Sequence, residues 1–391
     1  MTVNFELSGE QLDALHALRH ELHQHPELSS DEQATAKRIA RELSAAGASE
    51  VMTDVGGTGV IGLFESGEPG PTLVLRCELD ALPVSEPADM GIDYRSQSRG
   101  VSHKCGHDGH MSVLCGVATA LGVHAPKRGR VALLFQPAEE TGEGAPAILA
   151  DERFQALNPD YVIGFHNLPK HELHSICIRR GTFASASEGF RIALHGAFSH
   201  SSYPEHGTSP GAAVAKLLAK LPELPGEIAS SGELLMLTLT QASLGENGPK
   251  MDFGVAPGVA EICGVIRAHQ QQELEQLKSK IAELAGQVSE EQELQWELSW
   301  HEAFPATVNH DDSVELIRSA AERAGLQVTE LDEPFRWSED FSHYLQRYQG
   351  AFFGVGSGVE QPQLHNEYYD FPDELIVTGV RVYLSIISAI L

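Results

Sequence analysis

The chain lacks the features that mark membrane-spanning and secreted proteins. No apolar run reaches the roughly 18 to 20 residues that a membrane-spanning helix requires. The apolar C-terminal segment 382–391 is only about half that length, which favours a last core helix. The first residues contain neither a basic patch nor an apolar stretch of signal-peptide type, so we expect a cytoplasmic protein without a membrane partner.

Cysteine is scarce and positive charge is low. The five cysteines are odd in number and scattered, which fits a reducing compartment rather than a disulfide framework and leaves a thiol available for metal binding. The 27 lysines and arginines face 55 aspartates and glutamates, and the formal net charge of -28 would repel a phosphate backbone. We therefore expect no nucleic-acid partner.

The length and composition favour a folded chain of two domains. One ordinary hydrophobic core does not extend over 391 residues. Hydrophobic residues make up 42% and charged residues 21%, a globular composition. The sequence contains no internal repeat and no low-complexity tract.

Helices are predicted first and buried strands after them. Ser8 and Gln11 form a capping-box pattern before one apolar-periodic segment, and Ser30 and Gln33 repeat the pattern before a second. The segment 111–121 suits a crossover helix. Short, uniformly apolar runs indicate buried strands of a mixed α/β sheet at 60–64, 72–75, 131–135 and 161–165.

A different pattern begins near residue 184. Signals for strand, helix, strand, strand, helix and strand follow one another at 190–194, 211–221, 233–240, 259–266, 271–285 and 294–298. This order is typical of a small ferredoxin-like α+β sandwich. We interpret residues 184–300 as a domain inserted into a catalytic, metal-binding domain made of residues 1–183 and 301–391. The predicted fold class is α/β, a mixed-sheet domain with an inserted α+β domain.

The stretch S-H-K-C-G-H-D-G-H at 102–110 gathers three histidines, a cysteine and an aspartate. Such groups are costly to bury unpaired, and imidazole and thiolate ligands suit zinc and its first-row neighbours. Cys105 and His107 can supply two donors from one turn, whereas a metal site requires three or four. A histidine-rich surface loop is the simpler interpretation, so donors elsewhere in the chain decide between the two.

Three further stretches supply such donors: Q-P-A-E-E at 136–140, G-F-H-N at 164–167 and L-H-N-E at 364–367. Two adjacent glutamates usually form a solvated surface pair. Here the pair follows an apolar strand, and in open α/β sheets ligands gather beyond the carboxyl ends of strands. One carboxylate can bind a metal while the other takes a proton from water. Five donors are enough for two metals that share a bridging ligand: Cys105, His107, Glu140, His166 and His365.

The sequence resembles the metal-dependent amidohydrolases that include hippurate hydrolase, indole-acetyl-amino-acid hydrolases, N-acetyl-diaminopimelate deacetylase and aminobenzoyl-glutamate hydrolase, within the zinc peptidase and aminoacylase superfamily. The resemblance covers nearly the whole chain. Together its motifs are highly specific: H-Q-H-P-E-L-S at 23–29, L-R-C-E-L-D-A-L-P at 75–83, H-K-C-G-H-D-G-H at 103–110, P-A-E-E at 137–140, G-F-H-N-L-P at 164–169, S-E-D-F at 338–341 and L-H-N-E at 364–367.

This resemblance implies a cofactor and a ligand set. Two divalent ions, zinc or manganese, would be bridged by Cys105. His107 and His166 would bind one ion, and Glu140 and His365 would bind the other.

The resemblance also implies roles for residues that do not bind the ions. Glu139 would be the general base, and Asp80 would orient a ligand from behind. His200, in H-G-A-F-S-H-S-S-Y-P at 195–204, would help to hold the substrate carbonyl as it becomes an oxyanion, the alternative being an ordinary surface-loop histidine. The inserted domain would act as a lid or dimerisation domain, through which the chain would form a homodimer.

Two stretches depart from the family pattern. Cys77 and Glu78 stand where the family usually has the alanine and first aspartate of R-A-D-M-D, which could move that carboxylate by a methylene. Gly254 stands in F-G-V-A-P where the family usually has the asparagine of F-N-V-I-P, and this bears on specificity more than on catalysis.

We therefore expect a metallohydrolase that cleaves the amide bond of an N-acyl amino acid, with Glu139 passing a proton from water to the leaving amine. Two alternatives stay open. One is a cysteine amidase with Cys105 as nucleophile, and the other is a non-catalytic binding protein stabilised by a metal. Neither alternative gives a role to Glu139 beside Glu140.

Overall fold

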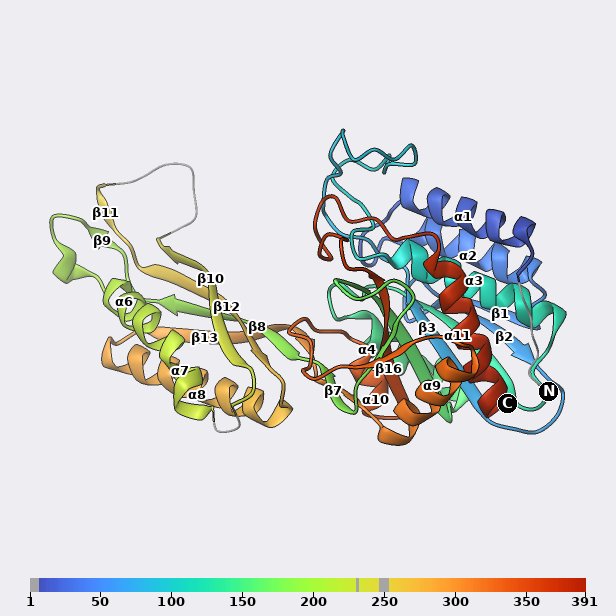
Figure 1. Cartoon of the computed structure of the whole chain (residues 1–391). Coiled ribbons are helices and arrows are strands. Elements are labelled where there is room, and N and C mark those ends of the chain that lie inside the picture. The colour runs from blue at the N-terminus through green and yellow to red at the C-terminus, as the bar shows by residue number, and fades with distance from the viewer. Residues whose placement is uncertain (1–6, 230–231, 246–252) are drawn as a thin grey trace. The chain divides into compact units, whose positions relative to one another are not determined.

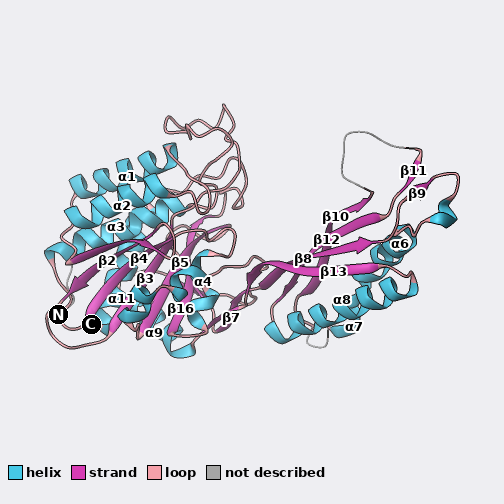
Figure 2. Cartoon of the chain, turned by 180° about the vertical axis from the view of Figure 1, so that it is seen from behind, coloured by secondary structure: helices cyan, strands magenta, loops and turns pink. Residues whose placement is uncertain are grey.

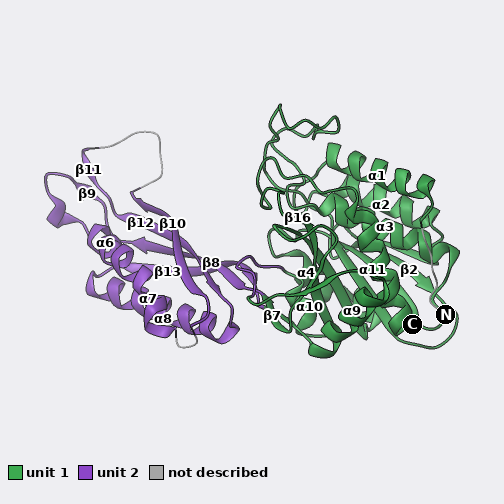
Figure 3. Cartoon of the chain, viewed as in Figure 1, with its two compact units in different colours: residues 1–183, 307–333, 340–391 green, residues 184–306, 334–339 purple. Residues whose placement is uncertain are grey.

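Two compact units make up the computed structural model, which describes residues 7–229, 232–245 and 253–391. The first unit comprises residues 1–183, 307–333 and 340–391, and the second comprises residues 184–306 and 334–339 (Figure 3). Each unit has its own hydrophobic core. The predicted fold class, a mixed-sheet α/β unit with an inserted α+β unit, is confirmed.

The second unit is larger than the expected interval 184–300. It extends to residue 306 because its last strand runs to Phe304. It also takes in residues 334–339, because the backbone N–H of Ser185 donates to the carbonyls of Phe335 and Trp337, both at 3.0 Å. A short return segment of this kind leaves no periodic signal in the sequence.

An eight-stranded mixed sheet forms the centre of the first unit, in the order β1-β2-β4-β3-β5-β16-β6-β15. The strands are Glu50–Val55 (β1), Gly59–Glu65 (β2), Thr72–Glu78 (β3), Arg130–Gln136 (β4), Tyr161–Pro169 (β5), Ile176–Ile178 (β6), Val328–Glu330 (β15) and Gln349–Gly358 (β16). The four predicted buried strands are β2 to β5, and each is buried along almost its whole length. Strands β3, β4, β5 and β16 run parallel, so their carboxyl ends meet at one edge.

Helices pack on both faces of this sheet. Five of them form one layer (Figures 1 and 2): Gly9–Gln24 (α1), Gln33–Ala45 (α2), His107–Val123 (α3), Asp311–Arg323 (α9) and Leu375–Ile390 (α11). Leu73, Leu75 and Cys77 of β3 belong to the core beneath that layer. Because side chains alternate along a strand, Arg76 points to the opposite face, where it pairs with Asp340. The short helices on that side are Gly144–Ala150 (α4), Glu152–Leu157 (α5) and Ser342–Leu345 (α10).

The two predicted helix starts have different outcomes. At α1 the capping box is present: Gln11 N–H donates to Ser8 Oγ at 3.2 Å, and Ser8 N–H donates to Gln11 Oε1 at 2.9 Å. The second box, from Ser30 to Gln33, is wrong, because the N-cap of α2 is Glu32 and makes no side-chain cap. The Glu32 carboxylate instead accepts from Ala138 N–H at 2.9 Å, a tertiary contact.

The second unit has the predicted strand-helix-strand-strand-helix-strand order. Its antiparallel sheet, in the order β10-β12-β8-β13, consists of Ala186–His195 (β8), Leu235–Leu244 (β10), Val259–Ala268 (β12) and Gln295–Phe304 (β13). Its two long helices are Gly211–Lys220 (α6) and Gln271–Glu291 (α8). Smaller elements are Ser199–His200 (β9), Pro204–His206 (η1), Leu221–Glu223 (η2), Leu224–Ile228 (α7) and Val255–Ala256 (β11), and the short strands Gly181–Ala184 (β7) and Thr307–Asn309 (β14) pair separately.

Across the described ranges, no helix is both long enough and apolar enough to cross a membrane. The apolar C-terminal segment forms α11, whose inner face belongs to the core of the first unit, as the sequence predicted.

Candidate metal centre

The predicted donors meet at the edge where the parallel strands end. Asp80 follows β3, Glu139 and Glu140 follow β4, and His166 lies within β5. Cys105 precedes α3, and His107 is its first residue. Residues that are far apart in the sequence therefore face one another because of the strand order.

Gly106 separates Cys105 from His107 and allows both side chains to face the centre. It is the N-cap of α3 with φ at 88°, in the left-handed region that favours glycine. A Cβ at this position would lie 2.8 Å from Oδ1 of Asn167. The turn between the two donors thus depends on the absence of a side chain.

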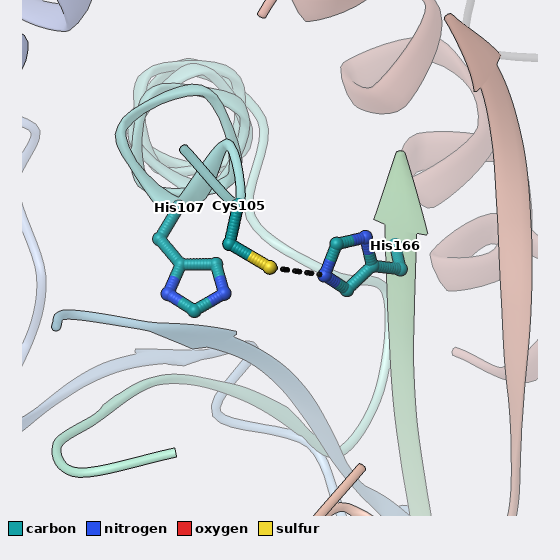
Figure 4. Close-up of side chains that lie close together, drawn as sticks. All are labelled: Cys105, His107 and His166. Carbon is teal, nitrogen blue, oxygen red and sulfur yellow. Dashed lines mark hydrogen bonds between the residues drawn. The ribbon is translucent and has the colours of Figure 1, made fainter. Parts of the chain in front are cut away.

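Cys105 lies between two imidazoles. Its Sγ is 3.3 Å from Nε2 of His166 and 3.4 Å from Nε2 of His365. Figure 4 shows the thiol pointing toward the ring of His166, with the ring of His107 beside it. Cys105 and His166 are buried, whereas the side chain of His365 is 52% exposed, so the centre opens to solvent on the His365 side.

Glu140 lies between two of the imidazoles. Its Oε1 lies 3.9 Å from Nε2 of His107 and 3.6 Å from Nε2 of His365. Five sets of donor atoms in the described residues each lie within 4.8 Å of one another, and three of them consist of predicted site residues alone: Cys105, His107 and His166; Cys105, Glu140 and His365; and His107, Glu139 and Glu140. Cys105 belongs to two of these sets, which is the arrangement that a bridging ligand requires.

Hydrogen bonds orient the imidazoles. Nδ1 of His107 lies 2.9 Å from the carbonyl oxygen of Asp80, and Nδ1 of His166 lies 2.9 Å from the carbonyl oxygen of Asn167. A carbonyl only accepts, so each Nδ1 carries its proton and each Nε2 is the atom directed at the centre.

Asp80 acts behind the donors. Its Oδ2 accepts from Ser29 Oγ at 2.7 Å and from the backbone N–H of Glu140 at 3.0 Å, and its Oδ1 lies 3.6 Å from Nδ1 of His107. The carboxylate of Asp80 therefore fixes the backbone of Glu140, while its backbone carbonyl orients the ring of His107.

Two of the three predicted histidine ligands are neutral, because their pKa values are lowered. Burial, helped by His110, lowers the pKa of His166 well below its ordinary value. Burial and then His107 lower the pKa of His365 to about 4. A neutral imidazole keeps the lone pair that binds a metal.

The pKa values of the remaining donors are raised. Burial alone would lower the pKa of His107, but the carboxylates of Asp80, Glu78 and Glu140 raise it to about 10. Burial raises the pKa of Glu140 to about 7. Burial, with the neighbouring carboxylates of Glu140 and Glu139, raises the pKa of the Cys105 thiol well above its ordinary value. A cation bound here would displace these protons.

Buried polar atoms test whether the centre suits a cation. Nε2 of His107, Oε1 of Glu140 and Oδ1 of Asp80 are buried without a hydrogen-bond partner in the described part of the chain. Each such atom costs about 1 to 3 kcal/mol unless something compensates it. Because imidazole nitrogen and carboxylate oxygen are metal donors, these residues fit a divalent ion.

The two other predicted catalytic residues lie in different units. Glu139 is 5% exposed and lies in the first unit, beside His107 and Glu140. His200 lies on β9 of the second unit, is exposed, and accepts from Ser202 N–H on Nδ1 at 3.1 Å. Gly254 accepts from Ser201 N–H at 2.8 Å through its carbonyl, a contact that needs no side chain.

Sequence reasoning missed a buried chain of polar groups behind the donors. Nδ1 of His110 lies 2.6 Å from Oε2 of Glu78, and its Nε2 lies 2.5 Å from Oδ1 of Asn167. Arg76 pairs with Glu78 on the other side. His110 lies within 4.8 Å of donor atoms of His107 and Glu78, but both of its ring nitrogens already have protein partners. The three-residue spacing of His107 and His110 on one helix was the signal that could have revealed it.

The chain is similar to known hydrolases and to a solved metal-binding structure. Residues 74–389 match the profile of Peptidase family M20/M25/M40. The chain is 31% identical over 341 residues to N-acetyl-L-cysteine deacetylase of Bacillus subtilis, covering 86% of this chain and 79% of that protein. It is 29% identical to hippurate hydrolase of Campylobacter jejuni over 94% of both chains. A crystal structure of a dinuclear metal-binding peptidase from B. subtilis superposes with a TM-score of 0.80 at 25% identity over 98% of both chains.

Proposed function

The chain belongs to peptidase family M20/M25/M40, and we propose that it is a metal-dependent amidohydrolase that cleaves the amide bond of N-acyl amino acids. The observation that carries this proposal is the convergence of four further donor residues on Cys105. The substrate class rests on two relatives, one named for N-acetyl-cysteine and the other for hippurate.

We assign the five donors to two divalent ions, zinc or manganese. Cys105 would be the ligand shared by both ions, His107 and His166 would hold one ion, and Glu140 and His365 would hold the other. When bound, such ions supply Lewis acidity, which polarises an amide carbonyl and makes water a better nucleophile near neutral pH. The dinuclear B. subtilis structure supports the number of ions.

Proton transfer is assigned to Glu139. Its carboxylate lies next to the donors without belonging to either of the two sets that contain Cys105. In this position it can take the proton of the attacking water and pass it to the nitrogen of the leaving amino acid. Asp80 keeps Glu140 and His107 in place during these steps.

His200 is assigned to the substrate carbonyl. Its exposed ring can donate a hydrogen bond to the oxygen that becomes negative when water attacks. A homodimer formed through the second unit and a cytoplasmic location remain predictions from the sequence.

The surroundings of Cys105 favour the metal function over a cysteine amidase. A nucleophilic cysteine needs a lowered pKa, supplied by nearby positive charge. Here burial and the carboxylates of Glu140 and Glu139 raise the pKa of the thiol. The protein groups alone therefore disfavour a thiolate, and the adjacent Glu139 gives the site a base that a binding protein would not need.

A hydrolysis screen tests the proposal. Protein stripped of metal, and protein reloaded with zinc or with manganese, should be incubated with N-acetyl, benzoyl and indole-acetyl amino acids. We expect release of free amino acid only from reloaded protein. Full activity in a sample verified to be metal-free would contradict the metal function, and no hydrolysis of any member would contradict the substrate class.

A further inference from the structure

The residues on either side of the donor pair Cys105 and His107 are themselves held by buried charges. Lys104 precedes the pair and Asp108 follows it, and both side chains are fully buried. Neither belongs to a donor set. Buried charges are costly unless they are paired, so their partners show what fixes this turn.

Asp108 is held from α1. Its Oδ2 lies 2.8 Å from Nδ1 of His23 and 3.3 Å from Nη1 of Arg19. Arg19 also pairs with Asp370 at 2.7 Å and Asp373 at 2.7 Å, in the segment that follows His365. Arg19 thus links the start of α3 to the segment that carries His365.

Lys104 is held through Glu86. Its Nζ lies 2.5 Å from Oε1 of Glu86 and 2.9 Å from the carbonyl oxygen of Tyr369. The carbonyl of Lys104 accepts from the backbone N–H of His365 at 2.9 Å. A displacement of Lys104 would therefore move both Cys105 and His365.

His23 connects these two anchors. Its Nδ1 faces Asp108, and its Nε2 lies 2.7 Å from Oε1 of Glu86. Both partners are carboxylates, which only accept, so both ring nitrogens donate and the ring is an imidazolium. Its side chain is fully buried, so this cation can be compensated only by these neighbours.

We propose that His23 is a positioning residue for the metal centre: by bridging Asp108 and Glu86 it fixes the spacing between Cys105 and His107. Its two side-chain partners, Asp108 and Glu86, belong to no donor set among the described residues. The inference rests on the proposed function, because it assigns to α1 a role toward the metals that those residues would hold. Residues that hold metal ligands in place commonly change metal affinity by about 10- to 100-fold when they are replaced.

The test uses cobalt(II) as the probe, because a thiolate bound to it absorbs in the near ultraviolet. The full chain is stripped of metal and titrated with Co²⁺, and the apparent dissociation constant is read from that band. The variant is His23→Asn, which can donate to one carboxylate but carries no charge and does not reach both. We expect it to bind Co²⁺ about 10- to 100-fold more weakly than the parent.

The matched control is His16→Asn, the same change seven residues earlier on α1. His16 is not among the buried residues of α1, and its side chain forms no hydrogen bond or ion pair with the residues that the structure describes. We expect its Co²⁺ affinity to stay within about twofold of the parent, well short of the change expected when a ligand-positioning residue is lost. A His23→Asn variant that loses thermal stability but keeps the parental affinity would overturn the proposal, since His23 would then be structural only.

A second variant covers the case in which His23→Asn does not fold. Glu86→Gln keeps the shape of the bridge and removes the charge that joins His23 to Lys104. We expect the same direction of change, and parental affinity in folded Glu86→Gln would overturn the proposal. If the parent itself shows no thiolate band, the proposed metal centre is contradicted, and this inference is contradicted with it. If the parent binds Co²⁺ and a folded variant binds it equally well, only the positioning role of His23 is contradicted.

Discussion

At the scale of single residues, the neighbours Glu139 and Glu140 have different surroundings although they are chemically identical. The backbone of Glu140 is fixed by Asp80, and its carboxylate lies near His107 and His365. Glu139 lies outside the two donor sets that share Cys105. Adjacent positions with separate contacts can carry separate tasks.

Glutamine substitutions should separate these tasks. Glu139→Gln should lower kcat by about 10² to 10⁴-fold with metal content unchanged, because it removes a base and no ligand. Glu140→Gln should instead lose metal, measured as bound ion per chain after dialysis. Equal metal content and equal loss of turnover in the two variants would show that this division is wrong.

The reactivity of Cys105 gives a second prediction at this scale. A thiolate that bridges two cations has its lone pairs engaged, so iodoacetamide should label Cys105 slowly in loaded protein and faster after the metals are removed. Mass spectrometry locates the label, and the other cysteines, Cys77, Cys115, Cys177 and Cys263, serve as internal comparisons. Rapid labelling of Cys105 in loaded, active protein, with activity lost in step, would favour the cysteine nucleophile instead.

At the scale of elements, the start of α3 depends on one backbone conformation. Gly106 adopts a left-handed conformation between two donors and lies against the amide of Asn167, which contacts His110. The helix thus begins at the donor pair because the turn before it has no side chain. The start of α3 can approach Asn167 of β5 this closely because Gly106 has no Cβ.

Gly106→Ala should therefore affect the metal centre as well as stability. The left-handed backbone alone costs about 1 to 3 kcal/mol for alanine, and the added Cβ would also push Asn167 aside. Gly47→Ala is the matched control, because Gly47 has φ at 89° and no heavy atom within 4 Å of such a Cβ. The unfolding temperature and the metal content should both fall for Gly106→Ala. Only the unfolding temperature should fall for Gly47→Ala, and loss of metal in both variants would contradict this explanation.

At the scale of the whole molecule, the donors belong to one unit. All five proposed metal ligands lie in the first unit, and the second has a separate core around its own sheet. Ligand binding stabilises the native state in which the site exists, by about 2.7 kcal/mol when the free ion is at 100 times its dissociation constant. The stabilisation should therefore be unequal between the units.

Hydrogen exchange can measure this inequality. Adding metal to stripped protein should slow amide exchange at the ends of β3, β4 and β5 and at the start of α3. Exchange in α8 and β12 of the second unit should change little, and the comparison is internal to each sample. Equal slowing in both units would show that the metals stabilise the molecule as one cooperative body.

The sequence by itself determined the features whose signals are local. The capping box of Ser8 and Gln11 involves residues three apart, and the buried strands β2 to β5 are short continuous runs. The donor types were also readable, because imidazole, thiolate and carboxylate have few shared uses other than metal binding. The fold class followed from these local patterns, whereas the family followed from the resemblance of the sequence motifs.

Only the tertiary structure decided which of these groups meet. Glu32 stands at the N-cap of α2 in place of the predicted Ser30, and its carboxylate accepts from Ala138, 106 residues away, a contact that has no local signature. His23 reaches Glu86 and Asp108 because α1 packs beside α3, and His110 finds Asn167 across 57 residues. Local sequence fixes the period of an element and the chemistry of its side chains. The order of parallel strands brings distant segments to one edge, and burial there leaves each charge with the partners that packing provides.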